Sequence, residues 1–479
     1  MSTPVDHLSS LRTLTIDGAA VETADRFPVV NPATGEPFAT APAIAPAQLD
    51  SAVRAADAAF GSWRRDEDAR RAALLAAADA VDAAAGDLAA ILTAEQGKPL
   101  RDAATECFLV SLWLRYYAGL ELPPEIVRDD EKGYAEVHRR PVGVVAAITP
   151  WNFPLTLAMW KIAPALRAGN TVVIKPSPFT PLATLALGET LRDVLPPGVL
   201  NVVSGPDPLG ASLTTHPLVR KISFTGSTAT GKKVAAAAAD DLKRVTLELG
   251  GNDPAIVLPD APIAEIADTL FWSAFINNGQ TCLAAKRVYV HESRHDELVD
   301  ALAAIARDVQ VDEGTAEGAQ LGPVNNAPQF ERVTGLVRDA VDRGARVAAG
   351  GDRIDRPGYF FQPTILSGVS DGLAIVDEEQ FGPALPVIPY QDLEDAIARA
   401  NRTTYGLTAS VWSADPERAA IVAAEIDAGQ VTVNAHGSAV TPDLPFGGHK
   451  HSGIGVENGP WGLYGFTEIQ VLAGPPRRR

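Results

Sequence analysis

The sequence predicts an α/β fold organised around a doubly wound parallel sheet. From residue 141 onward, short apolar runs rich in β-branched residues alternate with helix-forming segments, which is typical of repeated βαβ units. The length of 479 residues exceeds what one simple core holds, and it predicts roughly two or three domains. The composition, with 46% hydrophobic and 21% charged residues, is ordinary for a globular protein.

The N-terminal part is predicted to be helical across residues 46–95. This stretch is rich in Ala, Leu, Asp and Arg, and its apolar positions follow helical spacing with glycine only at positions 61 and 86. The character changes after residue 141. Val142–Ile148 is a short apolar run that predicts a buried strand, and the Thr-Pro-Trp-Asn sequence after it indicates a loop.

Three further strand–loop–helix units follow in the same order. Thr171–Ile174 precedes Lys-Pro-Ser-Pro and a helix from about Pro181; Val199–Val203 precedes Ser-Gly-Pro and a helix; Lys221–Phe224 precedes Thr-Gly-Ser and a helix through the alanines at 235–239. Ligands of such sheets bind beyond the carboxyl ends of the strands. The loops of these units are therefore the predicted binding region.

A candidate nucleophile lies in the turn Asn278-Gly-Gln-Thr-Cys282. Cys282 is one of two cysteines, and most lone cysteines are small buried hydrophobes. Its polar and glycine neighbours do not resemble core packing, which favours a reactive thiol. Glu248 stands directly before Leu-Gly-Gly, and a carboxylate held near such a thiol can activate water.

A second candidate region is the glycine-containing loop Phe224–Gly231, between a predicted strand and a predicted helix. Its glycines permit close backbone approach, and free amide groups at a helix N-terminus bind phosphate. Alone this signal is weak, because it matches neither the G-x-G-x-x-G fingerprint nor a P-loop, and a plain tight turn explains it equally well. Lys175 at a strand end can be a ribose or phosphate ligand or simply an exposed lysine.

Charge and cysteine usage exclude several classes of function. A net charge of −18 argues against nucleic acid and against an anionic membrane surface, and the basic tip at residues 477–479 reads as a solvated end. Two cysteines cannot form a disulfide framework, and residues 1–7 do not resemble a signal peptide, so a cytoplasmic location is expected. Prolines interrupt the apolar region at residues 142–160, which does not read as a membrane span.

Seven motifs occur in one order along the chain: Ile148-Thr-Pro-Trp-Asn-Phe-Pro154, Lys175-Pro-Ser, Phe224-Thr-Gly-Ser227, Leu247-Glu-Leu-Gly-Gly251, Gly279-Gln-Thr-Cys282, Glu379-Gln-Phe-Gly-Pro383 and Pro445-Phe-Gly-Gly448. This series resembles the NAD(P)-dependent aldehyde dehydrogenase superfamily, in its non-phosphorylating, hydrolytic branch. The resemblance runs from near residue 20 to about residue 470. Single motifs arise by chance, but the ordered series is highly specific.

The resemblance implies oxidation of an aldehyde to a carboxylic acid through a covalent intermediate. Cys282 would add to the aldehyde carbon as a thiolate, and Asn152 would supply an oxyanion donor beside the Cys282 backbone N–H. Hydride transfer to the nicotinamide would leave a thioester, which water activated by Glu248 would hydrolyse. Glu457 is a second carboxylate, a proton-relay candidate ranked well below Glu248, and Cys107 is predicted to be dispensable.

The same resemblance implies the cofactor and substrate contacts. Lys175 would bind the adenosine ribose, Ser227 the pyrophosphate and Glu379 the nicotinamide ribose, with Phe381 against the nicotinamide. The remaining implied cofactor-site residues are Trp151, Ser177, Gly226, Gly250 and Gly251. Phe153 and Phe446 would line the substrate tunnel, together with Trp113, Tyr117, Leu283 and Val440. These tunnel residues are apolar or aromatic, which favours uncharged aliphatic or aromatic aldehydes over semialdehyde acids.

One departure from the family pattern concerns the cofactor. The family commonly carries a glutamate that binds the adenosine ribose hydroxyls where this chain has Pro178. We therefore expect NAD to be favoured and NADP to be tolerated. His449 and His451 have no neighbouring cysteine, and no metal is expected.

The resemblance further implies three structural parts. Residues 1–120 and 141–249 would form an NAD(P)-binding domain with a doubly wound parallel sheet, residues 250–450 an α/β catalytic domain, and residues 121–140 with 451–479 a β-ribbon oligomerisation arm. The strand-like, charged segment at 137–142 fits an exposed ribbon that needs a partner. A homodimer or a homotetramer is expected.

Three alternatives remain at this point. A CoA-acylating or phosphorylating relative would keep the cysteine but usually lacks the glutamate, and an inactive homologue would be expected to lose Cys282 or Asn152. A cysteine hydrolase needs a histidine partner, and none of the eight histidines lies near Cys282 in sequence.

Overall fold

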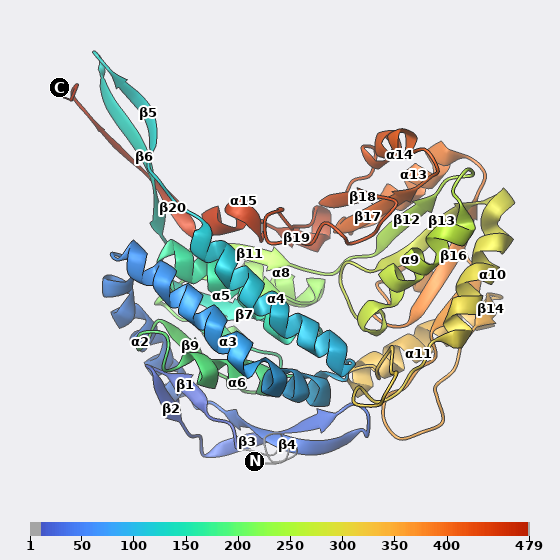
Figure 1. Ribbon diagram of the computed structural model, residues 1–479, viewed down its shortest axis with the longest axis horizontal. Helices are drawn as coiled ribbons and strands as arrows, with labels where there is room; N and C mark the ends of the chain where they lie inside the picture. Colours follow the sequence, from blue (N-terminus) through green and yellow to red (C-terminus); the bar gives the residue numbers. More distant parts are fainter. Residues whose placement is uncertain (1–10, 478–479) are drawn as a thin grey trace.

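A computed structural model describes residues 11–477 of the chain (Figure 1). Residues 1–7, which bear on the signal peptide, and the last two arginines of the basic tip lie outside the described residues. Two large sheets dominate the structure, each with its own helices, and a narrow three-stranded ribbon extends away from them at the upper left of Figure 1. In the described residues, no helix has the length and apolar character needed to cross a membrane.

The first sheet contains the predicted parallel strands and confirms the βαβ series. Its strand order is β19-β11-β10-β7-β8-β9-β1-β2. The parallel strands are β7 (Val144–Ile148), β8 (Thr171–Lys175), β9 (Leu200–Val202), β10 (Val219–Thr225) and β11 (Arg244–Glu248); antiparallel strands at the edges are β1 (Leu14–Ile16), β2 (Ala19–Val21) and β19 (Gly453–Ile454). The chain winds outward from β7 in one direction and from β10 in the other. The crevice between these two neighbouring strands is therefore the topological switch point where such sheets bind ligands.

Helices cover this sheet on both faces. They are α2 (Pro46–Trp63), α3 (Glu67–Gln96), α4 (Leu100–Gly119), α5 (Pro154–Ala168), α6 (Leu182–Leu191), α7 (Leu209–Thr214) and α8 (Thr228–Ala239). Right-handed crossovers place α5 and α6 on one face and α7 and α8 on the other. The stretch 46–95 is divided at residues 64–66, because the Asp66 carboxylate accepts the Ala69 N–H at 2.9 Å and begins a new helix there.

The second sheet is built from residues 253–433, and its strand order is β14-β15-β16-β13-β12-β17-β18. Only the β14–β15 pair is antiparallel among the described strands of this sheet. Its strands are β12 (Asp253–Val257), β13 (Ala285–His291), β14 (Arg346–Ala349), β15 (Thr364–Ser367), β16 (Ala384–Tyr390), β17 (Thr408–Trp412) and β18 (Gln430–Val433). Its helices are α9 (Ile263–Phe275), η1 (Ile276–Gly279), α10 (Glu292–Asp308), α11 (Ala327–Asp342), α12 (Ala374–Asp377), α13 (Leu393–Asn401) and α14 (Pro416–Ala423).

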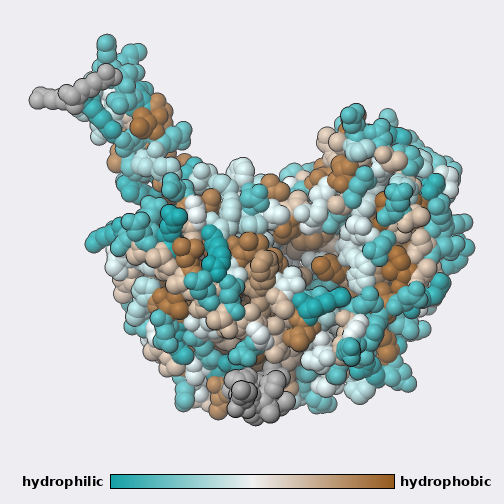
Figure 2. Space-filling model, in the orientation of Figure 1, coloured by the Kyte–Doolittle hydropathy of each residue, from teal (hydrophilic) through white to brown (hydrophobic). Residues whose placement is uncertain are grey.

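The ribbon consists of β5 (Glu125–Asp130), β6 (Gly133–Pro141) and β20 (Thr467–Gly474), all antiparallel. It exposes apolar side chains, with Ile126 62% and Val471 60% exposed, and Figure 2 shows hydrophobic atoms on it. Residues 453–454, expected in this ribbon, instead pair with β11 of the first sheet. The remaining elements are the hairpin β3 (Asp25–Asn31) with β4 (Glu36–Ala43), η2 (Lys450–Ser452) and α15 (Gly459–Tyr464).

Candidate active site

The turn that carries Cys282 has an unusual backbone that its residue types explain. Asn277, Asn278 and Gly279 all adopt left-handed conformations, with φ of 50°, 62° and 70°. Asparagine and glycine tolerate this region far better than other residues. The turn leaves Cys282 partly exposed at a cavity, whereas Cys107 in α4 is fully buried. The structure thus distinguishes one accessible thiol from one enclosed thiol.

The electrostatic surroundings of Cys282 keep its thiol protonated at neutral pH. Burial raises the pKa of Cys282 to about 12; the Lys286 ammonium opposes the rise, while Glu379 and Asp253 add to it. The thiolate is the nucleophilic form, so this cysteine needs a group that accepts its proton or stabilises the negative charge of the thiolate.

Glu248, at the end of β11, is a buried carboxyl group whose hydrogen-bonding capacity is unused. It is 2% exposed, and neither of its carboxyl oxygens has a hydrogen-bond partner among the described residues. Burial holds the pKa of Glu248 well above its usual range, the Glu457 carboxylate adds to this effect, and Lys161 opposes it. A carboxylate with a raised pKa is a stronger base, which suits the activation of water.

Glu457 is held in a separate buried ion pair. The Lys161 ammonium donates to Glu457 Oε1 at 2.6 Å and to Thr225 Oγ1 at 2.7 Å, and Ser223 donates to the same carboxylate at 3.2 Å. Both charged side chains are fully buried. This pairing satisfies one oxygen of Glu457, whereas Glu248 has no such partner.

Asn152 lies in the loop between β7 and α5, against the cysteine turn. Its Nδ2 donates to the Gln280 carbonyl at 2.9 Å. The amide nitrogen carries a second hydrogen, and the Cys282 backbone N–H donates to no protein acceptor within residues 11–477. The two neighbouring donors fit the requirements of an oxyanion site.

A buried network that the sequence analysis missed fixes the Asn152 loop. The Lys98 ammonium donates to Glu106 Oε2 at 2.5 Å and to the Asn152 carbonyl at 3.0 Å. Glu106 Oε1 accepts the N–H groups of Leu155 and Thr156, at 2.9 and 3.1 Å, and so caps the start of α5. Both charged residues are distant from the loop in sequence, and no local spacing signals their role.

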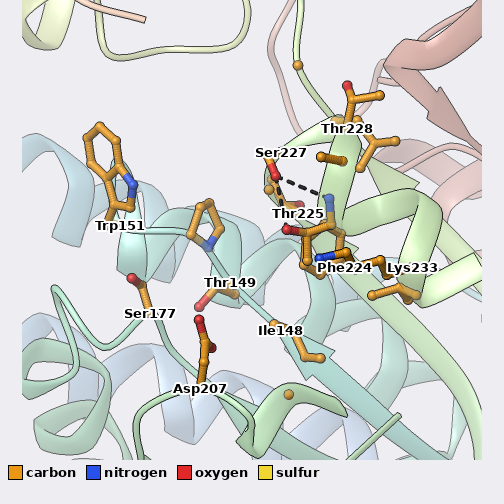
Figure 3. Close-up of a pocket in the computed structure, with 18 of the residues that line it drawn as sticks. Ile148, Thr149, Trp151, Ser177, Asp207, Phe224, Thr225, Ser227, Thr228 and Lys233 are labelled. Carbon is orange, nitrogen blue, oxygen red and sulfur yellow. Dashed lines mark hydrogen bonds between the residues drawn. The ribbon is translucent and has the colours of Figure 1, made fainter. Parts of the chain in front are cut away.

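A cavity of about 880 Å³ opens at the switch point and reaches Cys282 and Asn152. Eight of the nine residues implied to form the cofactor site line it: Trp151, Lys175, Ser177, Gly226, Ser227, Gly250, Glu379 and Phe381. Asp207, Thr228 and Lys233 line it as well and are shown in Figure 3. The cavity therefore brings together residues that belong to both large sheets and that lie more than two hundred positions apart in the sequence.

The N-terminus of α8 lies at this cavity. Ser227 is the N-cap residue, and its Oγ accepts the Thr230 N–H at 3.3 Å (Figure 3). Thr228, Ala229 and Thr230 of the first turn all line the cavity. A helix N-terminus with a nearby lysine suits a pyrophosphate, which fits the size and chemistry of NAD(P).

The other end of the cavity contains Glu379 and two aromatic rings. Glu379 Oε1 accepts the Gly251 N–H at 3.0 Å, and a Cβ atom at Gly250 would lie 2.3 Å from Glu379 Oε2. Trp151 and Phe381 meet edge to face, with ring centroids 5.3 Å apart. This arrangement offers a carboxylate and flat apolar surfaces to a ribose and a nicotinamide ring.

At two of the implied glycines, the packing of the protein itself leaves no room for a side chain. A Cβ atom at Gly226 would lie 2.5 Å from the Phe224 ring, and one at Gly251 would lie 2.6 Å from the Cys282 carbonyl oxygen. Gly226 lines the cavity, whereas Gly251 is absent from its lining. Close packing of the nucleophile turn therefore accounts for Gly251.

The implied tunnel residues are placed differently from the cofactor residues, and none lines this cavity. Trp113 is buried and donates from Nε1 to Asn458 Oδ1 at 2.8 Å, and Tyr117 is buried in the same core. Phe446 is also buried, with its ring 5.2 Å from that of Trp160. Phe153 is half-buried beneath the Lys98 ammonium, which lies 3.8 Å from the ring centroid; Leu283 and Val440 are partly buried as well.

The two histidines near the C-terminus, His449 and His451, have different surroundings. His449 Nδ1 lies 2.8 Å from Asp427 Oδ1, while His451 is exposed. Among residues 11–477 there is no group of three or more His, Cys, Asp or Glu side chains arranged to hold a metal ion.

Comparison with known proteins agrees with this geometry. The sequence profile of the "Aldehyde dehydrogenase family" matches residues 20–472. A phenylacetaldehyde dehydrogenase of Pseudomonas fluorescens is 40% identical, over 93% of this chain and 91% of its own. The structure of an NAD+ complex of a Bacillus cereus aldehyde dehydrogenase superposes with a TM-score of 0.96 at 35% identity, covering 100% of this chain and 99% of that one. An E. coli NADP-dependent enzyme superposes with a TM-score of 0.95 at 35% identity, covering 98% and 99%.

The chain belongs to the aldehyde dehydrogenase family. It is an oxidoreductase that converts an aldehyde to a carboxylic acid with NAD(P)+. The family resemblance and the fold inferred from the seven motifs are thereby confirmed.

Proposed function

We propose that Cys282 is the nucleophile of this oxidation, that Asn152 and the Cys282 N–H hold the oxyanion, and that Glu248 is the general base. The observation that carries the proposal is that Cys282 and Asn152 line the same cavity as eight of the nine predicted cofactor residues. A thiol in the wall of a cavity that holds the cofactor can keep a covalent intermediate close to the hydride acceptor.

The residues act in sequence around one carbon atom. The Cys282 thiolate attacks the aldehyde carbon, and the new oxyanion is held by the Asn152 amide and the backbone N–H. The residues of the cavity would hold NAD(P)+, which would supply the hydride acceptor. Collapse of the oxyanion to a carbonyl expels the hydride from this carbon and leaves a thioester on Cys282. The Glu248 carboxylate then takes a proton from water, which attacks the thioester and releases the acid, and the Cys282 thiolate is regenerated as leaving group.

The activity is tested by mixing the protein with a short aldehyde and NAD+ and following the absorbance of reduced cofactor. We expect turnover without CoA or phosphate, because the thioester is hydrolysed by water. Strict dependence on CoA or phosphate would contradict the role of Glu248, and acid formation without reduced cofactor would contradict the redox reaction.

We further propose that the substrates are uncharged aliphatic or aromatic aldehydes. Relatives of 40% identity are named for both kinds of substrate, phenylacetaldehyde and succinate semialdehyde, so their names favour neither. The support comes from Arg332 of the cavity, whose guanidinium already donates to Glu378 at 2.9 Å and is therefore engaged within the protein, not set aside for a second carboxylate of a substrate. A panel of aldehydes compared by kcat/KM tests this. A clear preference for succinic semialdehyde would contradict it.

For the cofactor we propose that NAD+ is favoured and NADP+ is tolerated, because Pro178 lines the cavity where a family glutamate would bind the ribose. We expect Pro178→Glu to shift the kcat/KM ratio towards NAD+. A charged acceptor adds about 1.5–3 kcal/mol to NAD+ binding and repels the extra phosphate of NADP+. Wild-type protein without detectable NADP+ activity would contradict this prediction.

Asp207 provides the control for that experiment. Its carboxylate lines the same cavity and influences the buried Lys175 ammonium, whose pKa is lowered by burial and raised again by Asp207 (Figure 3). If Asp207 already replaces the missing acid, Pro178→Glu leaves the ratio unchanged and Asp207→Asn moves it towards NADP+. The two single variants therefore separate the two explanations.

We also propose a homodimer or homotetramer assembled through the ribbon, a division into cofactor, catalytic and ribbon parts, and a cytoplasmic location. The exposed apolar residues of β5 and β20 support the ribbon as an interface, and two free cysteines suit a reducing compartment. Sedimentation of an Ile126→Asp, Val471→Asp variant tests the assembly. We expect this variant to be smaller than the wild-type particle, whereas an unchanged particle would contradict the proposal.

A further inference from the structure

Lys286 is a buried lysine that the proposed reaction does not use. It is the second residue of β13 and only 3% exposed. A lysine rarely lies this deep unless its ammonium is engaged, because burying an unpaired charge is costly. The contacts of this ammonium therefore indicate what it does.

The ammonium of Lys286 contacts the backbone of the nucleophile itself. It donates to the carbonyl of Thr281 and to the carbonyl of Cys282, both at 2.7 Å. Glu379 Oε1 lies 3.9 Å from the same nitrogen. Two carbonyls tied to one charged donor fix the peptide planes on either side of Cys282, and charge-assisted hydrogen bonds of this kind are among the stronger ones.

The charges around Cys282 give this contact an electrostatic role. Glu379, Asp253 and Glu248 face the thiol from three different elements, and each disfavours the thiolate. His436, beside Leu283, is held neutral, since burial lowers its pKa to about 3. Within the described chain, Lys286 is the cation that acts on the thiol against these acids.

We propose that Lys286 is the positioning residue of the nucleophile: its ammonium orients the Cys282 peptide and stabilises the thiolate. The proposal deepens the function proposed above, in which Cys282 is the nucleophile. With both carbonyls held by Lys286, the Cys282 N–H stays free for the oxyanion. The positive charge offsets the surrounding carboxylates when the thiol ionises.

The test measures thiolate formation without turnover. Cys282 is alkylated with iodoacetamide between pH 7 and 11, where the thiolate sulfur displaces iodide, and the product is located by mass spectrometry. Because the pKa of Cys282 is about 12, the thiolate is the minor form throughout this pH range and the alkylation rate reports how much of it is present. We expect Lys286→Met to slow the alkylation about tenfold at each pH, since an opposite charge within about 4–6 Å lowers a pKa by roughly one to three units.

Two variants distinguish a charge effect from a loss of structure. Lys286→Arg keeps the charge and is expected to retain an alkylation rate closer to wild type. Lys243→Met is the matched control, because Lys243 is also a buried lysine that donates to two carbonyls, those of Thr214 and His216, away from the thiol. Its profile is expected to match wild type.

The outcomes decide the proposal either way. A Lys286→Met profile that coincides with wild type overturns it, and so does a Lys286→Arg profile displaced as far as that of Lys286→Met. If Lys286→Met does not fold by circular dichroism, Lys286→Gln decides, because it keeps a hydrogen-bond donor and loses the charge: alkylation at the wild-type rate overturns the proposal. Loss of turnover in Cys282→Ala tests the nucleophile separately, so the two failures are distinguishable.

Discussion

Cys282→Ala is expected to abolish aldehyde oxidation while cofactor binding stays intact. The thiol forms the covalent bond to the aldehyde carbon, and alanine offers no nucleophile in its place. Removal of such a nucleophile lowers kcat by at least about 10⁴-fold, as it does in enzymes whose catalytic groups act as a unit. Steady-state production of reduced cofactor, followed by absorbance, measures the rate.

The controls for this variant come from the same chain. NAD+ titrated into Cys282→Ala by calorimetry should bind with the wild-type dissociation constant, because the residues proposed to hold the cofactor are other residues of the cavity. Cys107→Ala should keep full activity, since the Cys107 thiol is fully buried in α4 and does not line the cavity. Comparable turnover in the Cys282→Ala variant would remove the covalent mechanism.

Glu248→Gln is expected to separate the two halves of the reaction. Glutamine keeps the shape of the side chain but cannot accept the proton of water, so hydride transfer persists while hydrolysis of the thioester slows by roughly 10²–10⁴-fold. Rapid mixing with aldehyde and NAD+ should show a burst of reduced cofactor of about one per active site, followed by slow turnover. Quenched-flow detection of acylated Cys282 by mass spectrometry checks the same intermediate directly.

Glu457→Gln is the matched variant for this experiment. Glu457 is also a buried carboxyl near β11, but its charge is paired with Lys161 at 2.6 Å, whereas both oxygens of Glu248 are unpartnered. We expect a smaller fall in steady rate for Glu457→Gln and no accumulation of thioester. If the burst and the steady rate vanish together in Glu248→Gln, Glu248 instead takes part in activating Cys282.

Local patterns in the sequence determined much of the fold. The predicted strand at 142–148, of which residues 144–148 form β7, and the strands β8, β9 and β10 could be predicted because each is a short β-branched run followed by turn residues. The break between helices α2 and α3 at residues 64–66 could not be predicted, since it depends on one capping carboxylate inside a continuous helical pattern. The pairing of β19 with β11 joins residues about two hundred positions apart, and strand pairing over such distances has no local signature.

In the candidate site, too, some residues could be predicted from the sequence and others only from the structure. Cys282, Asn152, Glu248 and the cofactor loops carry motif-level signals, because turn chemistry and glycine placement are local properties of the chain. Lys286, Asp207 and the Lys98–Glu106 pair are functional neighbours that only the tertiary structure reveals. The sequence by itself thus determined the class of enzyme and its candidate reactive groups. The folded chain decided their surroundings, because burial, hydrogen bonds and electrostatic fields depend on distances in space between residues far apart in sequence.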